Sequence, residues 1–453
     1  MSANVDSVRQ ASRFGALNFL SGVGRTDAMT ADALGTVALN VVTIVVNFGL
    51  TVLLSRLLGA RGYGAFAFGL AWAAVLSVPA VLGLTPLIVR HVAAYQARSA
   101  WILLRGLLRR SNQVVAATSL LVMVGGAGLG WLLEGSKPEL FHPYLLALLL
   151  VPLVSLTTLR QSAMQGLGRV VLGRVPETLL APLLFLALVG VASALLGQRF
   201  SASWAMALQV AAQIAAFATG VVLLRRTLPA AVRGAAAAYE TRVWLRSAVP
   251  LLVMSGLMAL NAQLGTIFLG SMKGAAAAGV YGVATRAALF TSFFWLAATY
   301  PLMPAVARLH AQAKSAELQR MLSRGAVVTA LCSLPIALLL VIFGRQFLAL
   351  FGHDFRGGTW ALRILALGEL GKVLTGFAGL ALVMTGHERD LTAGVAIAAG
   401  LNIALNVTLI PVWGVDGAAV AGAVSVVASN LVLVYLLWRR LHLFSLPLPL
   451  LRR

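Results

Sequence analysis

The hexapeptide MTGHER, residues 384–389, stands between two long apolar stretches and repeats a pattern found earlier in the chain. Its skeleton, M-x-G-x-x-R, first occurs as MQGLGR at residues 164–169, 220 positions before. We predict that each copy marks a turn between two helices. Gly166 or Gly386 would end the preceding helix, and Arg169 or Arg389 would hold the turn at the cytoplasmic face.

Two further patterns recur with a shift of 218 positions. They are Tyr-Gly, at Tyr63-Gly64 and Tyr281-Gly282, and Pro-x-x-x-Arg, at Pro86–Arg90 and Pro304–Arg308. Three weak patterns that share nearly one offset favour an internal duplication, a plan found in membrane transporters.

The composition is typical of a membrane protein. Hydrophobic residues make up 60% of the 453 residues, charged residues 11%, and the mean hydropathy is +0.92, whereas soluble domains have about 25% charged residues. Apolar runs long enough to cross a hydrocarbon core of roughly 30 Å as a helix recur along the whole chain. We predict an all-α polytopic membrane protein with twelve spans, near residues 32–54, 62–84, 113–133, 141–163, 176–197, 202–224, 246–270, 278–300, 323–343, 358–384, 390–411 and 416–438.

The basic residues are distributed unevenly between these spans. With the N-terminus in the cytoplasm, 25 of the 35 Lys and Arg residues fall in cytoplasmic segments, seven in outer loops and three within spans. Because cytoplasmic loops of membrane proteins carry an excess of Lys and Arg, topology explains the net charge of +22 and no nucleic-acid partner is expected. We expect both termini to be cytoplasmic.

The repeat also predicts the domain organisation. Its offset moves six spans along the chain, so the two copies have the same orientation and are related by an axis along the membrane normal. Two six-helix bundles with a cleft between them are the usual plan for alternating access. The predicted parts are a cytoplasmic N-terminal segment (1–31), an N-terminal lobe (32–224), a cytoplasmic linker (225–245), a C-terminal lobe (246–438) and a cytoplasmic tail (439–453).

Two cations lie deep within predicted spans, where a charge is costly. Arg286 is about 12 Å into the eighth span and Lys372 about 21 Å into the tenth, at 1.5 Å per residue. Arg286 either bonds backbone carbonyls or an acid of another helix, or it binds an anionic substrate. The equivalent position in the first half, 218 residues earlier, is Phe68, so the charge is not part of the repeat. This asymmetry favours substrate binding. Glu369 lies three residues before Lys372, close enough to pair with it on one helical face. The alternative is that Glu369 has a coupled or proton-linked role.

Three further arginines are weaker candidates for substrate binding. Arg363 is shallower in its span and can reach the outer interface. Arg90 and Arg308 end the second and eighth spans at the cytoplasmic face. There they either guide a phosphate into the cleft or anchor the spans topologically.

Other polar residues within the spans are expected to have structural roles. Glu177 follows Pro176 at the start of the fifth span, the ordinary place for an acid at a helix N-terminus. Asn402 and Asn406 lie one turn apart and are expected to bond between helices.

The chain lacks the sequence motifs of enzymes. It contains no Walker loop, no H-E-x-x-H and no nucleophile elbow, and its six His have no metal-ligand spacing. The single Cys332 provides neither a disulfide nor a thiol metal site, and no removable signal peptide is evident. We expect no enzymatic activity, no cofactor and no metal; energy would come from ion gradients, membrane potential or substrate flux.

Three stretches carry a family resemblance. They are LLSRLLGARGYGAFAFGLAWAAVL (residues 53–76), GVYGVATRAALF followed by YPLMPAVARL (279–290 and 300–309), and MTGHERDLTAGVAIAAGLNIALNVTLIPVWGVDGAAVAGA (384–423). In order and spacing the chain resembles polysaccharide (O-antigen type) flippases of the multidrug/oligosaccharidyl-lipid/polysaccharide exporter superfamily.

The resemblance implies two six-helix lobes around a V-shaped, often cationic cavity. It implies movement of undecaprenyl-pyrophosphate-linked oligosaccharide units from the inner to the outer leaflet of a bacterial inner membrane, beside membrane lipids, a polysaccharide polymerase and glycosyltransferases. Arg286 and Lys372 would suit a pyrophosphate, since Arg forks and Lys point charges both bind phosphate oxygens. Glu369 is the candidate for ion coupling.

Several other functions compete with this interpretation. A cation-coupled multidrug exporter of the same superfamily would need intramembrane acids, and this chain offers mostly bases. A lipid II flippase commonly has extra spans. A membrane glycosyltransferase or polymerase would need loop carboxylates, of which the outer loops carry few, and a structural scaffold would not need buried charges.

Overall fold

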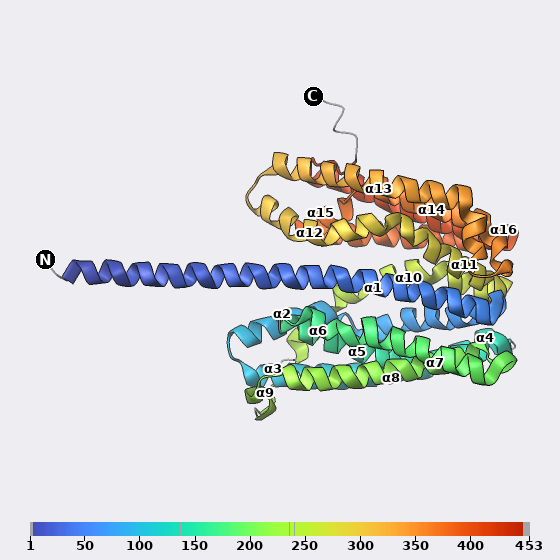
Figure 1. Ribbon diagram of the computed structural model, residues 1–453, viewed down its shortest axis with the longest axis horizontal. Helices are drawn as coiled ribbons and strands as arrows, with labels where there is room; N and C mark the ends of the chain where they lie inside the picture. Colours follow the sequence, from blue (N-terminus) through green and yellow to red (C-terminus); the bar gives the residue numbers. More distant parts are fainter. Residues whose placement is uncertain (1–2, 136, 235, 240, 447–453) are drawn as a thin grey trace.

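The computed structural model describes residues 3–446 except 136, 235 and 240, and the described part is helical (Figure 1). Residues 1–2 of the predicted N-terminal segment and 447–453 of the predicted tail lie outside the described residues. The elements are α1 (Ala3–Val81), α2 (Leu84–Ala97), α3 (Trp101–Glu134), α4 (Pro138–Leu148), α5 (Leu150–Gly166), α6 (Val170–Val175), the π-helical turn η1 (Pro176–Leu180), α7 (Ala181–Leu196), η2 (Gly197–Arg199), α8 (Ala202–Thr227), α9 (Ala230–Gly234), α10 (Thr241–Lys273), α11 (Ala275–Ala288), η3 (Leu289–Ser292), α12 (Phe293–Ala311), α13 (Ser315–Ala349), η4 (His353–Gly358), α14 (Thr359–Leu374), α15 (Ala378–Met384) and α16 (Glu388–Leu441).

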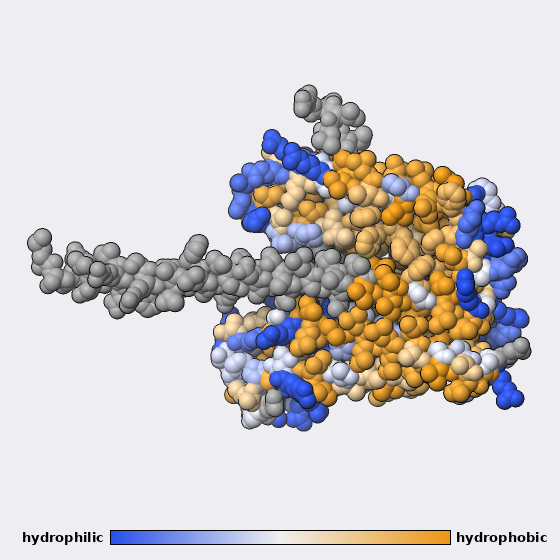
Figure 2. Space-filling model, viewed as in Figure 1, coloured by the Kyte–Doolittle hydropathy of each residue, from blue (hydrophilic) through white to orange (hydrophobic). Residues whose placement is uncertain are grey.

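The surface confirms a polytopic membrane protein. Figure 2 shows an apolar belt between two ends where hydrophilic residues gather. Large apolar side chains of the described helices are strongly exposed, among them Leu121 (73%), Leu195 (81%) and Val412 (75%). A monomeric soluble protein rarely exposes an apolar area of this extent, so the belt is the surface that faces hydrocarbon.

Two of the longest helices are broken at glycines. In the described part, nine helices are long and apolar enough to cross a bilayer, or ten if a pair bent by 46° at the end of α14 counts as one span. Gly59 (φ 64°) interrupts α1 and Gly414 (φ 55°) interrupts α16. These breaks fall between the first and second and between the eleventh and twelfth predicted spans. The number of twelve spans itself stays a prediction.

The turn at the M-x-G-x-x-R pattern has the same type of backbone hydrogen bond in both halves of the chain. The backbone N–H of Arg169 donates to the Met164 carbonyl (2.9 Å), and that of His387 donates to the Leu382 carbonyl (2.8 Å). The left-handed residues are Gly168 (φ 75°) and Gly386 (φ 83°), 218 positions apart.

The prediction that Gly166 releases its helix is therefore wrong. Gly166 is the last residue of α5 and lies against Val92 of α2, where a side chain would not fit. The positive φ of a helix-ending turn falls two residues later, on Gly168, because the left-handed position of such a turn comes after the last helical residues. The M-x-G-x-x-R letters repeat with an offset of 220, but the turn itself repeats with the offset of 218 that the other two patterns have.

The buried apolar residues form three clusters. The largest joins both halves of the sequence, with members in α1, α4, α8, α11 and α14. A second lies within residues 81–232 and a third within residues 306–443. The second and third lie toward the end of the molecule where both termini are found (Figure 1). The halves therefore share one core at one end and have separate cores at the other.

A crossing of two glycines sets the contact between α1 and α11. A Cβ atom on Gly64 would overlap the carbonyl oxygen of Ala275, and a Cβ atom on Gly279 would overlap that of Ala60. Small residues at a membrane helix interface let the backbones approach closely and gain van der Waals contact. The crossing therefore requires glycine at both positions.

We predict that Gly64→Ala lowers the thermal stability of the purified protein in detergent. Forcing an extra carbon into a packed contact typically costs about 1–3 kcal/mol. Gly49→Ala is the matched control, since Gly49 lies on the same helix with open space around it. Equal melting temperatures for the two variants would contradict the close crossing.

Candidate functional site

A cavity of about 420 Å³ lies where α1 meets the second half of the chain. Its wall on one side is the α1 segment that contains Asn47 and Thr51. The opposite wall comes from α11, η3, α12 and α14 and contributes Arg286, Trp295 and Lys372. We call it the Arg286 cavity. None of its lining residues is acidic, so its walls carry two positive charges and no lining negative charge.

Arg286 reaches across the cavity to α1. Its Nη1 atom donates to the hydroxyl of Thr51 (2.8 Å), which in turn donates to the backbone carbonyl of Asn47 (2.7 Å). The guanidinium lies 5.7 Å from the ring centre of Tyr63. Within the described residues no carboxylate pairs with Arg286, and its side chain is exposed to the cavity. To the described residues it donates one hydrogen bond, so further N–H groups of its five can meet an anion.

Lys372 lies in the same cavity but has a partner. Its ammonium is 3.0 Å from a carboxylate oxygen of Glu369 and 4.9 Å from the ring centre of Trp295. Both side chains are mostly shielded, at 23% and 15% exposure. The expected local pair is therefore present, while the ammonium still forms part of the cavity wall.

The remaining predicted binding residues lie elsewhere. Arg363 donates from Nε to the Val341 carbonyl (2.7 Å) and covers the ring of Trp360 at 4.9 Å. It does not line the Arg286 cavity. Arg90 in α2 and Arg308 in the last turn of α12 are both exposed and also lie outside the cavity lining. A binding role for these three arginines stays a prediction.

A buried ion pair was missed by the sequence analysis. Glu177 was expected to have a structural role at a helix N-terminus, and Arg160 was not among the candidate residues. Instead, Arg160 is 4% exposed and its Nη2 atom lies 2.5 Å from both carboxylate oxygens of Glu177, which also accepts from Gln161 (3.0 Å). The chain folds back through the turn at Gly168, which brings α5 against η1. The sequence offered one signal for this pair: the charge of Arg160 is not repeated in the second half, where the position 218 residues later is Ala378.

Asn402 bonds to another helix as expected, whereas Asn406 bonds to Asn402 within the same helix. The Asn402 side-chain amide donates to the Asn261 side chain on α10, and the Asn406 amide donates to the Asn402 side-chain oxygen (2.6 Å). Asn402 and Asn406 are almost fully buried. This polar ladder joins α10 to α16 within the apolar layer, where an unpaired amide would be costly.

Membrane-crossing helices around a cavity with two cations in its wall define a membrane transporter as the class of protein. Residues 29–310 match the family described as Polysaccharide biosynthesis protein, and residues 250–408 match the family described as MatE. The chain belongs to the polysaccharide biosynthesis protein family, whose match covers more than half of it. This confirms the resemblance to polysaccharide flippases.

A named relative is similar over part of the chain. Probable flippase AglR of Haloferax volcanii is 28% identical over 175 residues, which are 38% of this chain and 37% of AglR. The alignment thus covers well under half of that relative.

Two solved structures confirm the fold. A multidrug resistance MATE family transporter of the MOP superfamily in an inward-facing conformation has a TM-score of 0.71 and 14% identity, over 88% of this chain and 94% of that chain. The lipid II flippase MurJ in an inward closed conformation has a TM-score of 0.66 and 12% identity, over 89% and 86%.

We predict that Lys372→Ala destabilises the protein and that adding Glu369→Ala restores part of the loss. Removing the ammonium leaves a shielded carboxylate without its partner, which costs about 1–3 kcal/mol. Thermal unfolding of the two single variants and the double variant checks this. A double variant whose loss equals the sum of the two single losses would contradict the pairing.

Proposed function

We propose that the protein moves a lipid-linked oligosaccharide with a pyrophosphate bridge across the membrane, from the inner to the outer leaflet. The observation that supports this most is the Arg286 cavity, where a guanidinium without a carboxylate partner and a lysine ammonium line one space. A cation inside the apolar layer is costly, so an unneutralised one is the feature expected of an anion-binding wall.

The chemistry of the wall suits a pyrophosphate better than a single carboxylate. The Arg286 fork presents several N–H donors in one plane, and Lys372 adds a second charge. The neutral Thr51 hydroxyl is a weak competitor, because hydrogen bonds between two charged groups are stronger than bonds from a charged group to a neutral one. An arriving diphosphate can therefore replace Thr51 without breaking an ion pair.

The rest of the substrate would be shared between water and lipid. We propose that the sugar occupies the cavity while the polyprenyl chain stays in the bilayer between the two lobes. Aromatic rings form the apolar part of the wall, with Phe48 and Phe290 in edge-to-face contact at 5.4 Å. Such rings offer flat surfaces to the apolar faces of sugars.

Translocation would involve no covalent chemistry. We propose that the lobes at 32–224 and 246–438 rock about their shared core, so that the cavity faces each leaflet in turn. We further propose a bacterial inner membrane with both termini in the cytoplasm, undecaprenyl as the lipid, and glycosyltransferases and a polymerase as the neighbouring enzymes. Glu369, already beside Lys372, is the group we propose for ion coupling.

A second candidate is a cation-coupled multidrug exporter. The match of residues 250–408 to the MatE family and the aromatic wall of the Arg286 cavity favour it. The guanidinium of Arg286 opposes it, because it would repel an organic cation at close range, whereas the charge of Lys372 is offset by Glu369.

We predict that Arg286→Gln lowers transport at least about tenfold, because the lost charged hydrogen bonds are each worth about 1.5–3 kcal/mol. Arg286→Lys should retain part of the activity, since it keeps the charge and loses only the fork. The measurement is the amount of surface polysaccharide in cells whose only copy is the variant, with membrane levels of the protein matched.

Arg345→Gln is the control, since Arg345 is exposed and lies outside the cavity lining. Normal surface polysaccharide with Arg286→Gln would remove Arg286 from the site. Unchanged polysaccharide together with loss of cationic dye export would instead support the multidrug exporter.

A further inference from the structure

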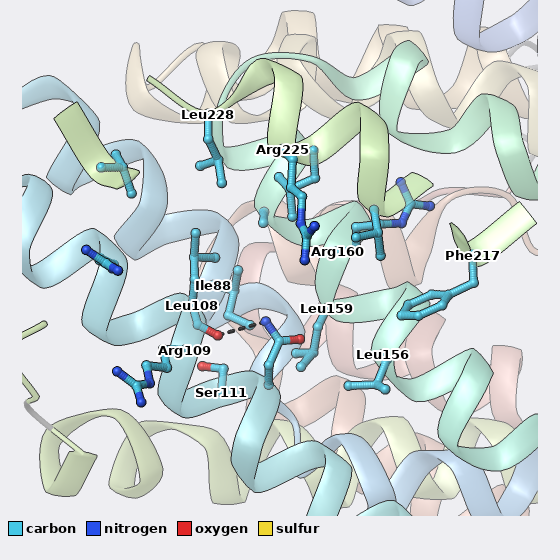
Figure 3. Close-up of a pocket in the computed structure, with 16 residues that line it drawn as sticks. Ile88, Leu108, Arg109, Ser111, Leu156, Leu159, Arg160, Phe217, Arg225 and Leu228 are labelled. Carbon is cyan, nitrogen blue, oxygen red and sulfur yellow. Dashed lines mark hydrogen bonds between the residues drawn. The ribbon is translucent and has the colours of Figure 1, made fainter. Parts of the chain in front are cut away.

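A second, larger cavity lies wholly within the first half of the chain. It has a volume of about 640 Å³ and is formed by α2, α3, α5, α8 and α9, with sixteen lining residues (Figure 3). It shares no lining residue with the Arg286 cavity. We call it the Arg160 cavity.

The polar part of its wall is strongly basic. Four of the lining residues are arginines, Arg105 and Arg109 from α3, Arg160 from α5 and Arg225 from the last turn of α8, and none of the sixteen is acidic. Figure 3 shows Arg109 and Ser111 on one helix and Arg225 on another. Arg160 forms an ion pair with Glu177, which does not line the cavity.

Arg160 is held in the wall with unused donors. Its side chain is almost fully buried, and only Nη2 is bonded to Glu177, while Nε and Nη1 are buried without a partner. Gly220 of α8 makes room for this group, because a Cβ atom there would overlap the guanidinium. A buried donor without a partner costs about 1–3 kcal/mol, so a ligand that satisfies these atoms gains stability on binding.

The other part of the wall is apolar and adjoins the lipid-facing surface. Phe217 and Val221 of α8 line the cavity, and Ile214 and Val222 on the same apolar, membrane-crossing helix are about half exposed, at 51% and 49%. A ligand with both a phosphate and a hydrocarbon chain would satisfy both kinds of wall. A free inorganic anion would leave the apolar part unused.

We infer that the Arg160 cavity binds the phosphate headgroup of an anionic membrane lipid. Arg109 and Arg225 bind the phosphate oxygens, Arg160 supplies the buried donors, and an acyl chain lies along Phe217 toward the bilayer. Basic pockets between membrane helices are suited to such headgroups. The inference does not depend on which substrate passes through the Arg286 cavity.

The test is native mass spectrometry of the full-length protein in detergent, titrated with phosphatidylglycerol. The double variant Arg109→Gln/Arg225→Gln should weaken binding at least about tenfold, since each Arg contributes charged hydrogen bonds to phosphate. Arg110→Gln/Arg226→Gln is the matched control. It removes the same charge from the neighbouring positions, both exposed and outside the lining, and should leave binding within about twofold.

Three results would overturn the inference. One is equal weakening by the two double variants, which would indicate a diffuse charge effect. Another is phosphatidylcholine binding as tightly as phosphatidylglycerol. The third is inorganic pyrophosphate binding as well as the lipid and displacing it. Neither double variant alters the buried Arg160–Glu177 pair. A folding defect would reduce the amount of monodisperse protein, whereas loss of the binding site would reduce lipid binding to a protein that stays monodisperse.

Discussion

A cation placed inside the hydrocarbon layer has to find a compensating group, and among the described residues Arg286 finds a hydroxyl and an aromatic ring but no carboxylate. Its Nη1 atom donates to the hydroxyl of Thr51 on α1, before the break at Gly59. Beyond that break, α1 and α11 approach backbone to backbone at Gly64 and Gly279, so α11 contacts α1 on both sides of the break. The fold thereby holds a positive charge at the cavity wall without neutralising it, which is the physical basis of the proposed anion transport.

The sequence predicts those features that depend on local rules. Apolar runs locate the membrane-crossing helices, and the breaks at Gly59 and Gly414 fall in gaps between predicted spans. The Glu369–Lys372 pair follows from a spacing of three residues on one helical face. The repeated turn also follows, although its left-handed glycine in the first half is Gly168, two residues beyond the one expected.

Features that depend on how helices pack against one another cannot be predicted from local sequence patterns. The Arg160–Glu177 pair forms because a turn reverses the chain between α5 and η1, and nothing in the spacing of seventeen residues reveals it. Bonds that join residues more than a hundred positions apart, such as Asn402 to Asn261, require the register between two helices. The Arg160 cavity likewise combines arginines from three helices, each of which alone is typical of a cytoplasmic anchor.

The central claim is that Arg286 and Lys372 face a water-filled space within the membrane layer. The most direct measurement is the labelling of Asn47→Cys, in a protein whose one native thiol is removed by Cys332→Ser, with a charged thiol reagent that does not cross membranes. Asn47 lines the Arg286 cavity, so the account predicts rapid labelling, while Leu121→Cys in the lipid-facing belt should resist the reagent. An unreactive thiol at position 47 in a folded protein, with added reagent on either side of the membrane, would contradict the account.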